Sequence, residues 1–491
     1  MYVSHPLIKK NKIEIREYQM DIAKNCMKKN TLVVLPTGMG KTPIALMVVA
    51  ERLNKLEGKI LFLAPTKPLI EQHKKTFEKL SELADLKVIS GTIKPENRGK
   101  EYKKARIVFS TPQTIQNDLK NRTLKLNDFV LLIVDEAHHS VGKYAYTYIA
   151  KRYLEESENP LIVGLTASPG SKLGKIKEIK ETLFIDQVES RIEQDKGISQ
   201  YVQEKEVQRI DVELPDDYKD AQKIIKKIFE SRVENLSKIG ALPTKRVSKK
   251  MLLDFQNFYM KKAQETRKKE MFFAVSKIAE SIKLDYCLEL LETQGAKPVG
   301  VYIKKLSTEK SKASYNMLAD SLFGVFSRKV SALGEHPKLG KLKEIVAKEL
   351  DKKVIIFTQY RATVDVIVKK LEEIKGAKVG KLVGQKSGLS QKQQVSVIRD
   401  FEEGFYNCLV CTSIGEEGLD IKGVGTAVFY EPVPSEIRSI QRRGRVARLI
   451  KGKIYILVTK DTRDEAYYWT AYHKEKKMKR YLVKENLESF G

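Results

Sequence analysis

Two sections of the chain, far apart in the sequence, repeat one pattern: a short apolar run ends in small or polar residues, and an amphipathic stretch follows it. In the first section the apolar runs are Thr31–Leu35, Ile60–Leu63, Ile107–Phe109, Phe129–Val134 and Leu161–Val163. Runs that are apolar throughout are typical of parallel strands buried on both faces of a sheet. Their alternation with helical stretches predicts βαβ units and a doubly wound α/β domain.

The same alternation returns after residue 335. The apolar runs there are Val354–Phe357, Ala377–Val383, Cys408–Cys411, Thr426–Tyr430 and Lys453–Val458, and helical stretches include Arg361–Leu371 and Glu436–Arg443. Between the two sections the spacing of apolar residues predicts helices alone, over Tyr218–Ile239, Ser248–Tyr259, Thr266–Glu292 and Ser311–Val330. We therefore expect two α/β domains, 1–209 and 336–491, with an all-helical insertion, 210–335, between them.

The chain is strongly basic. Lys and Arg account for 91 of its 491 residues against 63 Asp and Glu, which gives a formal net charge of +28. Such an excess indicates a polyanionic partner, either nucleic acid or an anionic membrane surface, while a lysine-rich, heat-adapted surface is the alternative. No apolar stretch approaches the roughly 20 residues of a membrane-spanning helix, so we expect an intracellular, cytoplasmic protein with no membrane partner.

The first apolar run leads into a glycine-rich turn, Pro36–Thr42, with the sequence PTGMGKT. A strand, a glycine-rich turn and a helix N-terminus together form a phosphate-binding loop, because bare helix amides and the helix dipole attract an anion. Gly38 and Gly40 let the backbone wrap the phosphates. Lys41 brings a positive charge to the β- and γ-phosphates, and Thr42 offers a hydroxyl to Mg²⁺. A chance lysine in an ordinary turn is the less favoured interpretation.

Two carboxylates follow another apolar run. Asp135 and Glu136 come directly after Phe129–Val134, at the end of a strand where α/β sheets bind ligands. We expect Asp135 to hold Mg²⁺, directly or through water, and Glu136 to polarise the water that attacks the γ-phosphate. A solvated acidic turn would explain this pair alone, but the phosphate-binding loop upstream favours catalysis.

A basic segment near the C-terminus has one polar face. Gln441, Arg445 and Arg448 are spaced by four and three residues, which places them on one side of a helix. A solvated basic helix is the alternative explanation of this segment.

Taken in order, these segments resemble the motifs of superfamily 2 helicases and translocases. The matching segments are Arg16–Gln19, Pro36–Thr42, Ala64–Leu69, Ser110–Gln113, Asp135–His138, Leu165–Pro169, Ile356–Tyr360, Cys411–Ile421 and Gln441–Arg448. The helical insertion narrows the resemblance to the archaeal Hef helicases and their FANCM-type relatives, although Dicer and RIG-I-like helicases carry one too. The resemblance implies two RecA-like domains that bind ATP and Mg²⁺ between them.

The resemblance also implies a role for each motif residue. Residues implied to bind ATP are Arg16, Gln19, Thr37, Gly38, Met39, Gly40, Lys41, Thr42, Gly418 and Asp420. Residues implied in hydrolysis are Lys41, Asp135, Glu136, Gln441, Arg445 and Arg448, with Thr42 and Asp135 at the metal. Those implied to couple hydrolysis to movement are His138, Thr166 and Ser168. Those implied to contact nucleic acid are Thr66, Lys67, Ser110, Thr111, Thr358, Gln359, Thr412 and Ser413.

The function that we expect is an ATP-dependent helicase or translocase that remodels forked or branched DNA in DNA repair, in association with the nucleoid. The alternatives are an RNA-duplex-dependent ATPase or RNA helicase of the Dicer or RIG-I-like type, and an ATP-gated nucleic-acid clamp that is no enzyme. Hef helicases add a C-terminal nuclease domain, and no Glu-Arg-Lys-x-x-x-Asp nuclease motif occurs here. A nuclease domain or partner nuclease would therefore lie outside this chain. In the insertion, Lys245, Arg246, Lys249 and Lys250 either meet phosphates or only solvate helix faces.

Overall fold

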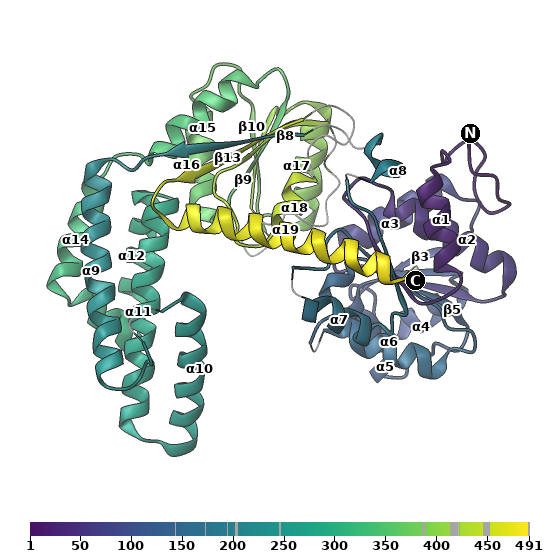
Figure 1. The fold of residues 1–491 in the computed structure, drawn as a ribbon, viewed down its shortest axis with the longest axis horizontal. Helices are drawn as coiled ribbons and strands as arrows, with labels where there is room; N and C mark the ends of the chain where they lie inside the picture. The colour runs from purple at the N-terminus through teal and green to yellow at the C-terminus, as the bar shows by residue number, and fades with distance from the viewer. Residues whose placement is uncertain are drawn as a thin grey trace.

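Two parallel β-sheets and a bundle of helices make up the molecule, in a computed structural model (Figure 1). The structure describes residues 1–142, 144–171, 173–193, 195–201, 205–244, 247–384, 388–412, 421, 423–444 and 452–489. The part built on the first sheet is called the first lobe, the part built on the second sheet the second lobe, and the helices of 216–332 the arm. The expectation of two parallel-sheet α/β domains with a helical region between them is confirmed.

The first lobe is a doubly wound parallel sheet with strand order β3-β4-β2-β5-β6-β1-β7. Its strands are β1 (Thr31–Val34), β2 (Lys59–Leu63), β3 (Leu86–Ile89), β4 (Ile107–Ser110), β5 (Phe129–Val134), β6 (Ile162–Thr166) and β7 (Gln187–Ser190). The central strands are buried on both faces, as their continuous apolar sequences predict. The edge strands β3 and β7 were not expected, because each mixes polar with apolar residues.

Helices cover both faces of this sheet. Those around it are α1 (Glu17–Cys26), α2 (Lys41–Lys55), α3 (Lys67–Leu80), α4 (Pro95–Lys104), α5 (Pro112–Lys120), the 3-10 turn η1 (Ala137–His139), α6 (Ala145–Glu156), α7 (Leu173–Thr182) and α8 (Lys196–Ser199). Helices α1 to α3 share one apolar cluster with the sheet, and α4 to α7 share the other. Because all seven strands are parallel, the segments that follow β1, β2, β4, β5 and β6 gather at one edge.

The second lobe is also parallel, with strand order β10-β11-β9-β12-β13-β8. Its strands are β8 (Lys205–Val212), β9 (Lys353–Phe357), β10 (Val379–Leu382), β11 (Cys408–Cys411), β12 (Val424–Phe429) and β13 (Gly452–Thr459). Its helices are α15 (Pro337–Lys348), α16 (Arg361–Leu371), α17 (Gln391–Glu403) and α18 (Glu436–Arg443).

Strand β8 was not expected, and it changes the division of the chain. Its whole length pairs with β13, from Lys205 opposite Gly452 to Val212 opposite Thr459. The boundary expected at residue 209 therefore falls inside a strand of the second sheet. Strand β8 lies at the edge of the sheet, where part of it meets water, and its sequence is rich in charged residues. It therefore lacks the apolar run by which the other strands were predicted.

The arm projects from the second lobe as a long bundle (Figure 1). Its helices are α9 (Asp216–Lys238), α10 (Lys249–Thr266), α11 (Lys269–Thr293), α12 (Ala296–Thr308), α13 (Lys312–Leu318) and α14 (Ser321–Ala332). The single helix expected over Ser311–Val330 is two, because Asp320 accepts hydrogen bonds from the amides of Leu322 and Phe323 and starts a new helix. Arg267, in a left-handed conformation, separates α10 from α11, which the sequence also predicts as two helices.

The last helix, α19 (Arg463–Ser489), leaves the second sheet and returns to the first lobe (Figure 1). Met478 and Leu482 join the apolar cluster of the first lobe. The Ser168 hydroxyl lies 2.9 Å from the Met478 sulfur, and the Ser190 hydroxyl donates to the Leu482 carbonyl over 3.2 Å. Helix α19 thus contacts both lobes. Within the described ranges, no helix has the length and apolar character that crossing a membrane requires.

Candidate functional site

The glycine-rich turn lies where the sequence predicts it, between β1 and the N-terminus of α2. Gly38 and Gly40 have φ angles of 85° and 84°, in the left-handed region that favours glycine. Lys41 begins α2, and its ammonium group donates to the Leu35 carbonyl over 3.1 Å. Amides in the first turn of an α-helix point out of its N-terminus, so this end of α2 attracts an anion.

Two side chains of α1 close on this turn from the other side. The Tyr18 hydroxyl and the Gln19 amide both donate to the Met39 carbonyl, over 2.8 and 3.0 Å. Gln19 lies so close to Gly40 that a Cβ on this glycine would overlap the amide. The Arg16 guanidinium stacks 4.5 Å above the Tyr201 ring. In this conformation Gln19 binds the turn itself, whereas the resemblance assigned Arg16 and Gln19 to the nucleotide.

Asp135 is held at the end of β5 by side chains from two helices. One carboxylate oxygen lies 2.8 Å from His73 Nε2 of α3, and the Asp135 carbonyl accepts a 2.8 Å hydrogen bond from the Tyr146 hydroxyl of α6. Both His73 and Asp135 are buried. Burial raises the pKa of Asp135, but His73 and Lys41 outweigh it, and the pKa lies below its ordinary value.

Neither His73 nor Tyr146 was expected at this site. A signal for His73 exists in hindsight, because it shares the buried face of α3 with Ile70 and Phe77, at spacings of three and four residues. A polar residue in an apolar stripe needs a partner in the interior. The sequence gives no means of knowing that this partner is Asp135.

Glu136, His138 and Thr166 form a short chain of contacts. Glu136 has a φ of 48°, an uncommon conformation for a residue with a side chain, of the kind that clusters at functional sites. His138 Nδ1 lies 3.2 Å from a Glu136 carboxylate oxygen and 3.2 Å from the Thr166 hydroxyl. The Thr166 hydroxyl in turn donates to the Ser168 carbonyl over 3.1 Å. The structure therefore brings the three predicted coupling residues to the side of the predicted water-activating carboxylate.

Helix α18, which carries Gln441, faces the glycine-rich turn from the second lobe. Gly444, just after α18, lies against Thr37, so closely that a Cβ at Gly444 would overlap the Thr37 side chain. Glu436 of α18 accepts a 2.8 Å hydrogen bond from the Ser171 amide. A cavity of about 160 Å³ lies between the lobes, lined by residues that include Pro36, Thr37, Ala167, Ile440 and Arg443. The end of α18 and the glycine-rich turn are therefore direct neighbours.

Several of the predicted site residues lie outside the part of the chain that the structure describes. These are Ser413, Gly418, Asp420, Arg445 and Arg448, together with Lys245 and Arg246 of the insertion. Gln441 is described and is buried in α18. Thr42 lies in the first turn of α2.

A buried carboxylate, Glu431, links α18 to the segment after β9. Its oxygens accept hydrogen bonds from the Thr358 hydroxyl at 3.0 Å and from the Gln359 amide at 2.6 Å. The Glu431 carbonyl accepts from Arg442, whose guanidinium also lies 3.7 Å from the carboxylate. Gln359 accepts a further hydrogen bond from Arg438 of α18 over 3.2 Å. The sequence did not point to Glu431, because no motif pattern marks it.

Two of the residues predicted to contact nucleic acid have buried hydroxyls. Ser110 is fully buried, and its hydroxyl donates to the Ile89 carbonyl of the neighbouring strand. Thr358 is fully buried too, with its hydroxyl on Glu431. In this conformation both hydroxyls serve the protein interior, and neither reaches a strand on the surface.

The other predicted contacts lie nearer the surface. Thr66 precedes α3, and its hydroxyl is buried without a hydrogen-bond partner in the described part of the chain. Lys67 forms an ion pair with Glu71 over 3.7 Å. Thr111 shares a 2.9 Å hydrogen bond with Thr114. Thr412 follows β11, and its amide donates to a carbonyl of β10.

Comparisons with known families follow the same division of the chain. Residues 12–171 match the model "Type III restriction enzyme, res subunit", and residues 337–450 match "Helicase conserved C-terminal domain". Residues 217–332, the arm, match "Putative ATP-dependent RNA helicase, helical bundle".

Similar proteins include two curated relatives and one solved structure. The chain is 41% identical to "Putative ATP-dependent RNA helicase MJ1505" of Methanocaldococcus jannaschii, over 98% of the chain and 62% of the relative. It is 31% identical to "ATP-dependent DNA helicase fml1" of Schizosaccharomyces pombe, over 91% of the chain and 57% of the relative. The crystal structure of the Pyrococcus furiosus Hef helicase domain matches with a TM-score of 0.71 and 39% identity, over 95% of this chain and all of that one. The chain thus spans about three fifths of the length of the two curated relatives.

Proposed function

Because the chain belongs to the Hef and FANCM type of superfamily 2 helicases, we propose that it is an ATP-dependent helicase or translocase that remodels forked or branched DNA. The observation that carries the proposal is the meeting of two distant motifs, where Thr37 of the glycine-rich turn touches Gly444 at the end of α18. A nucleotide at this turn lies between the lobes, so its binding and loss change the distance between them.

The residues at the sheet edge fit a magnesium nucleotide. The open N-terminus of α2 and Lys41 suit the phosphates, and Thr42 and Asp135 provide the oxygen ligands that Mg²⁺ prefers. Mg²⁺, when bound there, neutralises charge on the transferred phosphate. For nucleotide to enter, Gln19 releases the Met39 carbonyl that it now holds and becomes available to the adenine base.

Glu136 is the proposed general base for the attacking water. His138 contacts both Glu136 and Thr166, so a change at Glu136 during hydrolysis is transmitted to the segment before α7. Arg445 and Arg448 are proposed to supply positive charge to the triphosphate from the second lobe, because both follow α18 within five residues. Loss of the γ-phosphate removes the contact that these residues share, and the lobes then separate.

We propose DNA as the substrate because a similar solved structure is named as a Hef helicase and the fungal relatives as DNA helicases, and because a net charge of +28 favours a polyanion. A backbone phosphate is proposed at Thr66 and Lys67 because both lie at the N-terminus of α3, where helix amides favour an anion. A nuclease domain or partner nuclease, and association with the nucleoid, stay predictions.

RNA is the second candidate, because the Methanocaldococcus relative and the arm model carry RNA helicase in their names. Matched forks of DNA and RNA separate the two, since 2′-hydroxyl contacts are specific to RNA.

The test is steady-state ATP hydrolysis with equal concentrations of forked DNA, single-stranded DNA, blunt duplex DNA and the matched RNA fork. We expect the largest stimulation with forked DNA and no turnover in Lys41→Ala, whose circular dichroism should match the wild type. Equal rates with every nucleic acid, or with none, would contradict the proposal. A larger stimulation by the RNA fork would favour the second candidate.

A further inference from the structure

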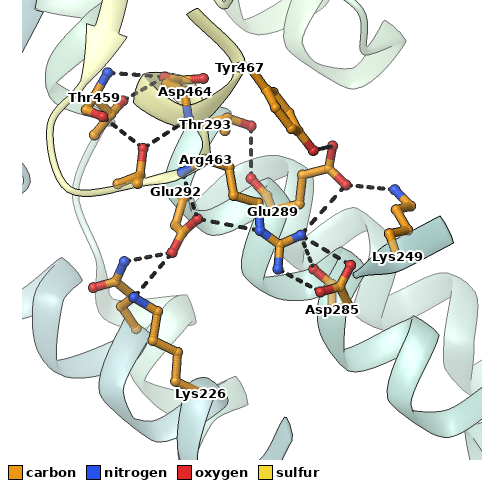
Figure 2. Close-up of polar contacts among 12 residues, drawn as sticks. Lys226, Lys249, Asp285, Glu289, Glu292, Thr293, Thr459, Arg463, Asp464 and Tyr467 are labelled. Carbon is orange, nitrogen blue, oxygen red and sulfur yellow. Dashed lines mark hydrogen bonds and ion pairs between the residues drawn. The ribbon is translucent and has the colours of Figure 1, made fainter. Parts of the chain in front are cut away.

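The arm is joined to the second lobe through three carboxylates on one face of α11. Arg463, the first residue of α19, lies among them (Figure 2). Its guanidinium contacts both oxygens of Asp285, at 2.6 and 3.1 Å, and approaches Glu292 to 3.7 Å and Glu289 to 3.9 Å. This partly buried arginine holds α11 firmly, because its three carboxylate partners are buried and breaking one of these pairs leaves a buried charge without compensation.

Glu289 also contacts α10, through Lys249 (Figure 2), and the start of α16, through Tyr360. One oxygen accepts a 2.7 Å hydrogen bond from the ammonium group of Lys249, the first residue of α10. The other accepts a 2.8 Å hydrogen bond from the Tyr360 hydroxyl, at the start of α16. Only 8% of the Glu289 side chain is exposed, against 41% of the Lys249 side chain, so Lys249 is the partner that an outside ligand can reach.

Tyr360 belongs to the segment that contacts α18. Burial and the negative charge of Glu289 raise the pKa of Tyr360 well above its ordinary value, so the hydroxyl keeps its proton and stays a donor. The preceding residue, Gln359, binds Glu431 through its amide and Arg438 through its side chain. A displacement of Tyr360 is therefore passed to α18, the helix that leads to Arg445 and Arg448.

We propose that Glu289 is a positioning residue that couples nucleic-acid binding by the arm to the nucleotide cleft, through competition between a phosphate and Glu289 for Lys249. This inference rests on the proposed function. When a strand phosphate binds Lys249, the buried carboxylate needs another cation, and Arg463 is already 3.9 Å away. Glu289 moves toward Arg463, and the Tyr360 hydroxyl that it holds moves with it.

A purely structural ion pair would behave differently. If Glu289 only held the arm in place, its loss would lower the melting temperature and reduce ATP hydrolysis equally with and without DNA. In the coupling role, its loss leaves hydrolysis without DNA unchanged and removes the response to DNA. The ratio of stimulated to basal turnover separates the two roles.

The experiment compares Glu289→Gln, Lys249→Met and their combination in the full chain. Lys343→Met is the matched control, because Lys343 pairs with Glu373 over the same 2.7 Å on the surface of the second lobe. Each variant is assayed for basal turnover, for turnover at saturating forked DNA and for the DNA concentration that gives half stimulation. Binding of labelled forked DNA, followed by fluorescence anisotropy, gives a readout without hydrolysis.

For Glu289→Gln we expect basal turnover within about twofold of wild type, DNA affinity not reduced, and stimulation lowered at least fivefold. Lys249→Met should lower the stimulation as well, and the double variant should lose no more than Glu289→Gln alone, since both act through one contact. Lys343→Met should match the wild type.

Full stimulation in Glu289→Gln would overturn the inference, and so would an equal loss of basal and stimulated turnover. If Glu289→Gln does not fold, Tyr360→Phe removes the same hydrogen bond from the other side and should lower the stimulation at least fivefold; unchanged stimulation in that variant would also overturn it. If the wild type shows no stimulation by any nucleic acid, the proposed function itself fails, an outcome distinct from these.

Discussion

His336 makes the junction of the arm and the second lobe sensitive to acid. It precedes α15 and is buried, with Nδ1 accepting a 3.2 Å hydrogen bond from the Lys338 amide and Nε2 lying 3.2 Å from the Glu292 carbonyl. Both contacts suit the neutral ring, which accepts at Nδ1 and donates at Nε2. Burial, with the neighbouring charge of Lys338, lowers the pKa of His336 to about 3.

The sign and size of the effect follow from this shift. The unfolded chain binds a proton near the ordinary pKa of about 6.5, whereas the folded protein does not until about pH 3. Between these values the unfolded state binds more protons, so the free energy of unfolding falls as the pH falls. At pH 5 protonation of His336 in the unfolded state raises the equilibrium constant for unfolding by a factor of about 30. This one residue should therefore lower the free energy of unfolding by about 2 kcal/mol.

The assay is urea unfolding at pH 8 and pH 5, followed by the fluorescence of Trp469. This is the single tryptophan of the chain and lies on α19, near the junction. His336→Asn is the control, because Asn also accepts a hydrogen bond at the start of a helix but does not titrate. Carboxylates elsewhere affect both proteins alike, so the wild type should lose about 2 kcal/mol more than the variant. Equal losses in the two proteins would refute the reasoning.

Two further predictions concern buried pairs. Lys338→Met leaves the fully buried Asp464 carboxylate without its cation and should lower the free energy of unfolding by about 3–5 kcal/mol in the same urea assay; a loss below about 1 kcal/mol would show that the pair contributes little. His73→Leu removes the donor that holds Asp135, and should raise the Mg²⁺ concentration for half-maximal binding of a fluorescent ATP analogue by about 10-fold or more. His73→Gln keeps a donor and should stay nearer the wild type, and an unchanged Mg²⁺ requirement in His73→Leu would contradict the positioning role.

The central strands and the helices that follow them could be predicted because each carries its own signal. Strand β5 and helices α16 and α18 have the bounds that the sequence predicts. The edge strands β3, β7 and β8 could not, because each mixes polar with apolar residues and so lacks the continuous apolar pattern of the central strands. β8 also joins a sheet whose other strands begin about 140 residues later, a pairing that no local pattern encodes.

The candidate site divides in the same way. The glycine-rich turn, Asp135 and Glu136 can be identified from the sequence, because their chemistry requires particular residues in consecutive positions. His73, Glu289 and Glu431 contact Asp135, Tyr360 and Gln359, which lie between 62 and 72 residues away in the sequence, so only the folded chain brings them together. Motif position also does not show that the hydroxyls of Ser110 and Thr358 turn inward.

Hydrolysis by Glu136→Gln tests the central claim most directly. Glutamine keeps the size of the side chain but cannot take a proton from water, so a fluorescent ATP analogue should bind within about threefold of wild type while single-turnover hydrolysis with forked DNA falls at least about 100-fold, the usual scale for loss of a general base. Unchanged single-turnover hydrolysis in this variant would contradict the account of a nucleotide cleaved beside Glu136 at the edge of the first sheet.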